Sequence, residues 1–472
     1  AEYACFVNCE NFQAMFRALD DEYMQARAAD IGDISQRVIK NLKGIADNAI
    51  DTITEPCIIV ANDLTPSDTA KIGGKPVAGF ITKIGGRTSH SAIMARSMGI
   101  PAIVGAGEKA DEIADGDLLL IDGAAGEVVA QPDEQTLADF AERQKADAAH
   151  RAMLAQYKDK EGATSDGRRV IIEGNIGTPD DAVRVAELGG EGVGLFRSEF
   201  LFMDRTDLPS EEEQFAAYKK ACEIMQGKPV IIRTLDIGGD KEVPALALEK
   251  EQNPFLGYRA IRICLNQPEL FLIQLRALLR AAQYGDLRIM FPMISSVDEV
   301  RGAKQVLEQA KDMLTAEGVP FNPNVKVGIM VEIPVAAVCA DVLAKEVDFF
   351  SIGTNDLIQY SCAVDRINEK ISYLYRPLHP GVLRLIAMTA KAANENGIEV
   401  GVCGEMAGTA GMAPVLCGLG VTNLSMSASA MLAAKADLAK HSCGECKELA
   451  DKLLACASAS DAERIFADWR ES

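Results

Sequence analysis

The chain has 472 residues, 48% of them hydrophobic, which is enough for two or three domains with large cores. Its formal net charge of −21 argues against nucleic acid and anionic membrane surfaces as partners, so an anionic substrate must be held by local Arg and Lys side chains. No apolar run reaches the roughly 18 residues of a membrane span, and the 12 scattered cysteines are typical of a reduced cytoplasmic protein.

The first third of the chain predicts three parts. Residues 10–43 carry apolar side chains at helical spacing, which predicts a partial helical domain over 1–43. Short apolar runs separated by Gly and Pro turns then predict a small α/β domain over 44–130. Residues 133–160 are charged, rich in Ala and free of Gly and Pro, which predicts a solvated linker helix within 131–160.

One of the four histidines, His90, follows a Gly-Gly turn and opens a predicted helix. Gly85 and Gly86 let the backbone approach a ligand. Free N–H groups at the start of the helix, with Arg87 and Ser89 beside them, suit an anion. Imidazole is nucleophilic at neutral pH, so we interpret His90 as a phosphoryl acceptor. The alternative is a helix N-terminus in which the histidine is incidental.

The remaining residues, 161–472, show a different pattern. Eight short apolar runs recur there, each followed by a helical stretch: 170–176, 192–196, 230–235, 287–294, 325–331, 349–352, 399–403 and 424–426. Eight such units predict a (β/α)8 barrel of the TIM type. A doubly wound open sheet is the structural alternative.

Polar side chains stand at the end of nearly every predicted strand. They are Asn175, Arg197, Glu199, Arg233, Asp236, Glu332, Asn355, Asp356, Cys403, Glu405 and Ser425, with Lys241, Arg259, Arg262 and Arg366 in the loops. Active sites of such barrels lie at the C-terminal ends of the strands, so we expect these side chains to share one mouth.

The composition of the mouth limits its ligand. Four planar guanidinium groups bind phosphate or carboxylate in bidentate fashion and indicate a small polyanion; they belong to Arg197, Arg233, Arg259 and Arg366. Glu332 and Asp356 come from adjacent predicted strands and could hold one hard divalent ion, for which Mg²⁺ fits best. As alternatives, Asp356 is a helix N-cap and Glu332 is the ion-pair partner of a barrel arginine. Asn355 can donate to phosphate.

Two sets of cysteines admit more than one interpretation. Cys403 ends a strand beside glycines and faces the basic mouth, where a thiol can exchange a proton with a carbon acid, but it is equally a small buried hydrophobe. His441, Cys443 and Cys446 have the spacing of half a zinc site, with no matching second half in their charged, helical surroundings.

The motifs together resemble those of Enzyme I of the bacterial sugar phosphotransferase system, and they occur in that family's order over nearly the whole chain. The matching stretches are GGRTSHSAIMAR (85–96), GLFRSEFLFMDR (194–205), RTLDIGGDK (233–241), NPFLGYRAIR (253–262), RIMFPMI (288–294), DFFSIGTNDLIQY (348–360), AVDR (363–366) and GVCGEMAG (401–408).

The resemblance implies the following roles. His90 is the phosphorylated histidine of a swivelling front domain, Glu332 and Asp356 bind Mg²⁺, and Cys403 protonates the enolate carbon. Phosphoenolpyruvate is bound by Arg197, Arg233, Lys241, Arg259, Asn355 and Arg366. The implied activity is transfer of the phosphoryl group of phosphoenolpyruvate to the histidine and then to a histidine phosphocarrier protein, with release of pyruvate. A cytoplasmic homodimer formed through the barrel is implied as well.

The resemblance also sets expectations about the first residues and about motion. The chain begins partway through the family's helical, carrier-docking subdomain, so we expect it to accept and pass on phosphate poorly. Hinges for the swivel are expected at 126–133 and 162–167, where glycines lie on either side of the linker.

Three other functions are compatible with parts of the pattern. Pyruvate phosphate dikinase and phosphoenolpyruvate synthase share the histidine segment and a similar barrel, but they need a nucleotide-binding domain, and no Walker-type phosphate loop is present in this sequence. A metal-dependent lyase or aldolase would use the barrel alone. A non-enzymatic Enzyme I-like regulator would not need the polar mouth.

Overall fold

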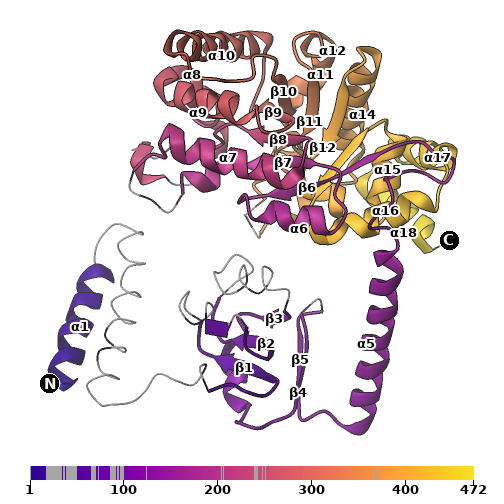
Figure 1. Ribbon diagram of the computed structural model, residues 1–472. Coiled ribbons are helices and arrows are strands. Elements are labelled where there is room, and N and C mark those ends of the chain that lie inside the picture. The colour runs from indigo at the N-terminus through magenta and orange to yellow at the C-terminus, as the bar shows by residue number, and fades with distance from the viewer. Residues whose placement is uncertain are drawn as a thin grey trace. The chain divides into compact units, whose positions relative to one another are not determined.

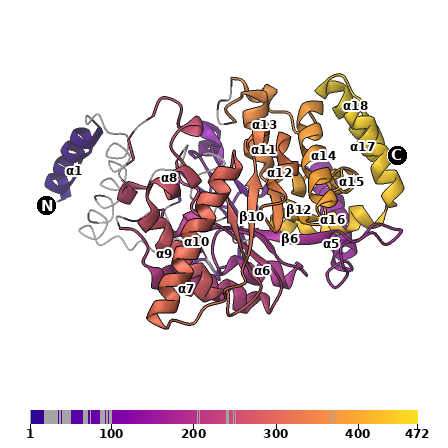
Figure 2. The same cartoon turned by 90° about the horizontal axis from the view of Figure 1, so that it is seen from above.

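The computed structural model describes most of the chain as two compact units, residues 1–148 and 149–472. Figures 1 and 2 show it from two sides. The described residues are 2–17, 35, 38, 50, 52–64, 68, 71–72, 74–85, 92, 95, 100–123, 125–203, 205, 207–238, 243–246, 248–249, 251–366, 368 and 370–471.

The first unit contains a small parallel sheet of β1 (Cys57–Ala61), β2 (Val77–Thr82) and β3 (Ala102–Ile103). The hairpin of β4 (Leu119–Asp122) and β5 (Glu127–Ala130) follows. Successive residues of β2 face opposite sides of the sheet, so Phe80 packs into one apolar cluster and Ile81 into another. All five strands were predicted as apolar runs from the sequence.

The helix predicted over 10–43 is only partly within the described residues. Helix α1 (Glu2–Arg17) begins eight residues earlier than predicted. Of the rest of that prediction, only Ser35 and Val38 are described, both helical.

The predicted linker is helix α5 (Glu134–Ala155). Asp133 caps its first turn, because the Asp133 carboxylate accepts a hydrogen bond from the backbone N–H of Thr136 at 2.8 Å. The helix buries none of its residues, which agrees with the solvated linker predicted from its charge.

In the second unit, eight parallel strands form a closed barrel, so the prediction of a (β/α)8 fold is confirmed and the open-sheet alternative is excluded. Pairing of β9 with β10 completes the ring. The strands are β6 (Ile171–Ile176), β7 (Val193–Arg197), β8 (Val230–Arg233), β9 (Leu287–Phe291), β10 (Lys326–Val331), β11 (Phe349–Ile352), β12 (Glu399–Val402) and β13 (Asn423–Met426).

Helices follow the strands and cover the outside of the barrel (Figure 2). Their bounds are α6 (Asp181–Glu187), η2 (Ser198–Leu201), α7 (Glu211–Met225), α8 (Ile261–Asn266), α9 (Pro268–Ala281), α10 (Val297–Glu317), α11 (Pro334–Val338), α12 (Ala340–Leu343), α13 (Thr354–Cys362), α14 (Pro380–Glu395), η6 (Glu405–Gly408), α15 (Met412–Gly418), α16 (Met431–Ala439), α17 (Cys443–Leu454) and α18 (Ala459–Glu471). Capping boxes begin three of them, at Ser210, Ser296 and Ser442.

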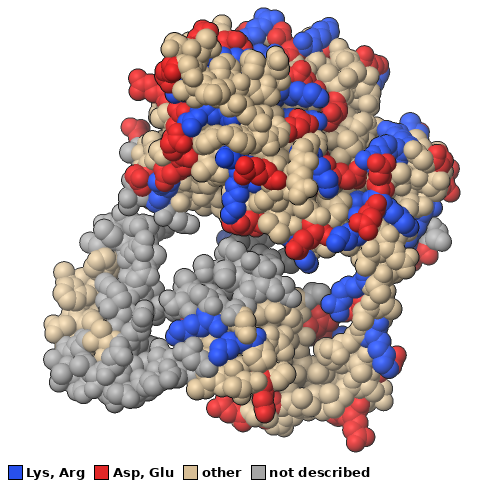
Figure 3. Space-filling view, viewed as in Figure 1, with Lys and Arg blue, Asp and Glu red and all other residues tan. Residues whose placement is uncertain are grey.

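Apolar strands buried on both faces explain the barrel. Every residue of β8, β9 and β11 is buried, as expected for parallel strands covered by helices. Charged side chains of both signs are interspersed on the face of this unit shown in Figure 3. None of the described helices is long and apolar enough to cross a bilayer.

Candidate active site at the barrel mouth

Two of the predicted site residues, His90 and Lys241, lie outside the described residues. The turn before His90 is described at its first residue. Gly85 has a φ of 111°, which favours glycine. A Cβ added to Gly105 would lie 2.7 Å from the Gly85 carbonyl oxygen, so these two loops approach each other closely. The positive φ of Gly85 is consistent with a turn at that residue, while the rest of the predicted Gly-Gly turn lies outside the described residues.

Seven of the other eight predicted residues lie at the C-terminal ends of the barrel strands or in the segments that directly follow them. Arg197 and Arg233 end β7 and β8, while Glu332 and Cys403 directly follow β10 and β12. Arg259, Asn355 and Asp356 are in the adjoining loop and first helical turn, while Arg366 follows α13 and acts, with Asp356, on the pKa of Tyr375. Parallel strands of a closed barrel end on one side, so these seven predicted residues are gathered at one mouth.

Two arginines of the mouth are buried among carboxylates. Arg233 lies between Glu199 and Asp236, at 2.5 and 2.8 Å. Arg259 contacts Asp236 at 2.8 Å and Asp356 at 3.5 Å. These partners fix the planes of both guanidinium groups. They also raise the pKa of each arginine, although burial acts in the opposite direction.

Each paired arginine keeps a buried donor that is not used. The Nε atoms of Arg233 and Arg259 are buried and hydrogen-bond to no described residue. Arg197 and Arg366 make no side-chain hydrogen bond or ion pair within the described part of the chain. Two guanidinium groups are thus held in place and two are unpaired, and all four have donors available, which suits a small anion with several oxygens.

The carboxylate of Glu332 is buried against other carboxylates. Only 1% of Glu332 is exposed, and its Oε1 accepts a hydrogen bond of 2.6 Å from the backbone N–H of Met293. Met293 has a φ of 56°, a strained conformation for a non-glycine residue, and it aims this N–H at the site. Burial, together with the charges of Asp356 and Asp236, raises the pKa of Glu332 to about 8.

Asn355 and Asn175 join neighbouring strand ends. The Asn355 Oδ1 accepts a hydrogen bond from the backbone N–H of Glu405 at 3.1 Å. The Asn175 Nδ2 donates to the backbone carbonyl of Cys403 at 2.9 Å, and its Oδ1 accepts from the Ser425 hydroxyl at 2.6 Å. Asn355 therefore has a structural bond besides any ligand contact, and Asn175 positions the backbone at Cys403.

Cys403 is 2% exposed and lies in the barrel interior. Burial raises the pKa of the thiol to about 11, although the hydrogen bond from Ser351 and the charge of Arg233 lower it. The group is therefore a protonated thiol at neutral pH, able to donate a proton but not to act as a ready nucleophile.

Sequence reasoning missed several parts of the mouth. It identified Glu199 and Asp236 as strand-end residues but not as partners of the arginines. It did not identify Tyr360, whose hydroxyl accepts from Arg259 at 3.1 Å. The half zinc site is not supported, because no group of three or more metal-ligating His, Cys, Asp or Glu side chains occurs among the described residues. Instead, the Cys443 Sγ accepts from Arg168 at 3.2 Å.

Comparison with known proteins defines the class. The model of the PEP-binding domain of PEP-utilising enzymes matches residues 151–443. The model of the mobile domain of the same enzymes matches residues 53–126. The barrel with its basic mouth thus belongs to an enzyme that uses phosphoenolpyruvate, in agreement with the polyanion expected from four arginines.

Individual relatives specify the family. The phosphoenolpyruvate-protein phosphotransferase of Priestia megaterium is 51% identical over 461 residues, which are 98% of this chain and 80% of that protein. The Bacillus subtilis (strain 168) protein of the same name is 50% identical over 472 residues, 100% of this chain and 82% of its own length. A solution structure of an Enzyme I protein shares 41% identity over 30% of this chain and 58% of that chain, with a TM-score of 0.26.

The chain belongs to the family of phosphoenolpyruvate-protein phosphotransferases. This confirms the resemblance to Enzyme I that its motifs indicated. It is a phosphotransferase dependent on phosphoenolpyruvate, and it acts in the first step of the phosphotransferase system.

Proposed function

We propose that the barrel mouth binds phosphoenolpyruvate and passes its phosphoryl group to His90, which delivers it to a histidine phosphocarrier protein. The observation that carries this proposal is the set of guanidinium groups gathered at one mouth. Buried, unused donors on Arg233 and Arg259 support direct contact with phosphate or carboxylate oxygens. Arg197 and Arg366 supply two further forks, and we assign Lys241 and Asn355 to the same ligand.

The carboxylates of the mouth fit a divalent cation. Asp356 Oδ1 is buried and accepts no hydrogen bond from any described residue, and Arg259 lies 3.5 Å from it. Burial, together with the charges of Asp356 and Asp236, raises the pKa of Glu332, and a cation beside it would offset both effects. Glu332 and Asp356 are therefore the residues to hold Mg²⁺, which when bound offsets the charge of the phosphate and of the leaving enolate oxygen.

Each step of the transfer then has a residue of this chain to perform it. The arginines orient the phosphoryl group and stabilise the charge that spreads over its oxygens in the transition state. A neutral His90 imidazole attacks phosphorus in line with the leaving oxygen. The Cys403 thiol gives its proton to the enolate carbon, so that pyruvate forms and the step becomes favourable overall.

The proposal extends to assembly. We propose a homodimer formed through the barrel unit. Exposed apolar side chains on α11, α12 and α14 support it: Val335, Val338, Val342 and Met388 are each 42–57% exposed.

Phosphorylation mapping tests the proposal. After incubation with phosphoenolpyruvate and Mg²⁺, we expect one acid-labile phosphate at His90 and release of pyruvate. His90→Ala should abolish both, whereas His150→Ala, which changes a histidine on the exposed linker α5, should retain them. Phosphate on another residue, or pyruvate release from the His90→Ala chain, would contradict the proposal.

A further inference from the structure

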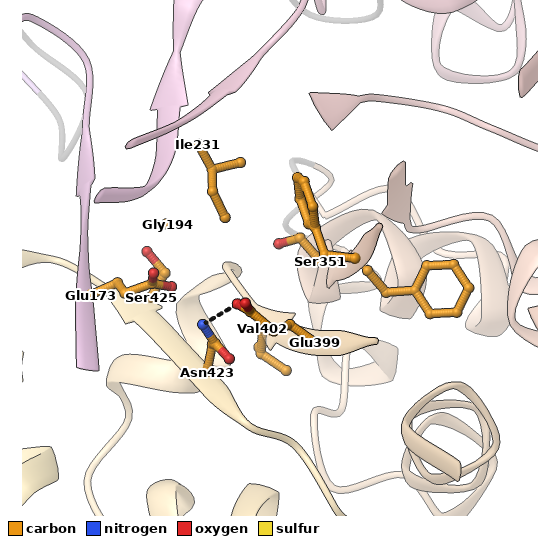
Figure 4. A pocket seen from close by; sticks show the side chains of 11 residues that line it. Glu173, Gly194, Ile231, Ser351, Glu399, Val402, Asn423 and Ser425 are labelled. Atoms are coloured by element: carbon orange, nitrogen blue, oxygen red, sulfur yellow. Dashed lines mark hydrogen bonds between the residues drawn. The ribbon is translucent and has the colours of Figure 1, made fainter. Parts of the chain in front are cut away.

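A small cavity lies inside the barrel, between the mouth and the opposite end. About 10 Å³ of it is open to the centre of a water molecule, which is room for a single water. Its polar lining comes from Glu173, Ser351, Glu399, Asn423 and Ser425. Figure 4 shows Glu173 and Ser425 on one side of the cavity and Ser351 across from them. The polar groups of these side chains can serve as hydrogen-bond partners for one water.

Glu173 is a buried carboxyl group in mid-strand that the phosphoryl transfer does not use. It is 1% exposed, and its Oε1 hydrogen-bonds to no described residue. Burial raises its pKa to about 7, with Arg288 acting against the shift and Glu399 adding to it. At neutral pH both the protonated and the ionised form of Glu173 are therefore populated. A group that gives and takes protons needs both forms.

One polar side chain connects this cavity with the proton donor of the mouth. Ser351 lines the cavity, and its side chain lies close enough to Cys403 to lower the pKa of the thiol, whose own hydrogen bond goes to the Ile352 carbonyl at 3.7 Å. The register places Ser351 beside Gly401, two residues before Cys403 on the same face of β12. The apolar neighbours of Cys403 in the barrel are Leu195, Ile231, Met290, Met330 and Phe349, and its charged neighbours Arg233, Arg197 and Glu332 belong to the mouth. Within the described chain, Ser351 thus offers the thiol a polar route toward the cavity.

The opposite side of the cavity leads toward solvent. Glu399 lines the cavity, and its side chain is 37% exposed, with Arg288 paired to it at 2.9 Å. The Asn423 Nδ2 donates to Glu399 Oε2 at 3.4 Å (Figure 4). Protons can therefore enter from the end of the barrel that is remote from the substrate.

We propose that Glu173 returns a proton to Cys403 after each turnover, through one water in this cavity and the Ser351 hydroxyl. The inference rests on the proposed function, in which Cys403 protonates the enolate carbon. That step breaks the S–H bond and forms a C–H bond of pyruvate, leaving a thiolate. Ser351 then protonates the thiolate, the water protonates Ser351, and the Glu173 carboxyl group protonates the water. Solvent at the Glu399 end restores the proton on Glu173.

The order of acidities favours this direction. The Cys403 thiol has a pKa of about 11 and Glu173 one of about 7, so a proton moves from the carboxyl group to the thiolate downhill. The other charged groups near Glu173 are Arg288, Glu399 and Glu191, and none of them has a hydrogen bond to Cys403 in the structure. Because Cys403 is 2% exposed, direct reprotonation by solvent is hindered.

The lifetime of the Cys403 thiolate tests the relay. Stopped-flow ultraviolet absorbance follows the thiolate after one turnover with phosphoenolpyruvate and Mg²⁺. Glu173→Gln keeps the shape of the side chain but has no acidic proton. In this variant we expect the thiolate signal to last about 100-fold longer than in the wild type. This factor is the lower end of what a positioned proton donor contributes to a rate. Ser351→Ala should lengthen it as well, and Glu173→Asp should restore the short lifetime.

Two controls separate the possible failures. Cys403→Ser should give no thiolate signal, which assigns the absorbance to Cys403. An unchanged thiolate lifetime in Glu173→Gln overturns the relay. An equally long lifetime in Glu173→Asp overturns it as well, because it would indicate a packing role for Glu173. If Cys403→Ser still forms pyruvate at the wild-type rate, the proposed proton donor itself is wrong. If Cys403→Ser forms no pyruvate while the thiolate lifetime in Glu173→Gln equals that of the wild type, the relay is refuted and the proposed proton donor is not.

Discussion

At the scale of single residues, Glu332 shows how the mouth disfavours the charged form of one of its own carboxyl groups. Its carboxylate is buried near Asp356 and Asp236, and the hydrogen bond from Met293 only partly compensates. A Cβ at Gly353 would lie 2.8 Å from Glu332 Oε2, so glycine is needed beside this carboxylate. A cation bound there relieves repulsion that the fold itself maintains.

The raised pKa of Glu332 predicts a pH dependence of stability. The folded chain holds a proton on Glu332 up to about pH 8, whereas the unfolded chain loses it near pH 4.5. Folding therefore binds more protons in that window, and this group makes the free energy of unfolding fall as pH rises through it. In Glu332→Gln we expect a shallower fall, measured by urea denaturation at several pH values. Equal slopes in the two proteins would contradict the assignment.

The residue scale also shows what sequence could predict. The strand-end positions of Arg197, Arg233, Glu332 and Cys403 follow from the apolar runs, because a strand that ends at the mouth places its last residue beside it. The ion pairs between the arginines and the carboxylates could not be predicted, because they depend on where the folded loops place these side chains. The buried Glu173 gave a weaker signal, an ionisable residue within a strand-like apolar run, which pattern reasoning treated as ordinary strand.

At the scale of elements, the segment after the linker differs from expectation. Residues 162–167 were predicted as a hinge, but hydrogen bonds hold them against the barrel. The Gly162 N–H donates to Glu191 at 3.0 Å, and the Ser165 N–H donates to the His441 carbonyl at 2.9 Å. Glycine content alone predicted flexibility there, whereas tertiary contacts fix the segment.

A buried lysine of α16 anchors the same region. Lys435 is 1% exposed, and its ammonium group donates to the carbonyl oxygens of Gly189 at 2.6 Å and Lys160 at 2.7 Å. Lys435→Met leaves these acceptors without a partner, so we expect a loss of about 1–3 kcal/mol in the free energy of unfolding. Lys440→Met, at the exposed end of the helix, should cost under about 0.5 kcal/mol. Chemical denaturation measures both, and similar losses would refute the anchoring role.

At the scale of the whole molecule, the described mouth residues all belong to the second unit, while His90 belongs to the first. We expect a fragment of residues 149–472 to bind phosphoenolpyruvate in the presence of Mg²⁺ by calorimetry and to sediment as a dimer, yet to form no phosphohistidine. A folded fragment that fails to bind would show that the first unit supplies essential ligand contacts. A monomeric fragment would contradict the proposed dimer surface.

The exposed linker helix has a practical consequence. With 22 residues at the usual rise, α5 is a rod of about 33 Å. No core depends on its side chains, so a fluorophore can be attached at almost any of its turns without disturbing the chemistry. Such a probe, paired with one on the barrel, offers a way to watch the histidine-bearing unit travel during catalysis.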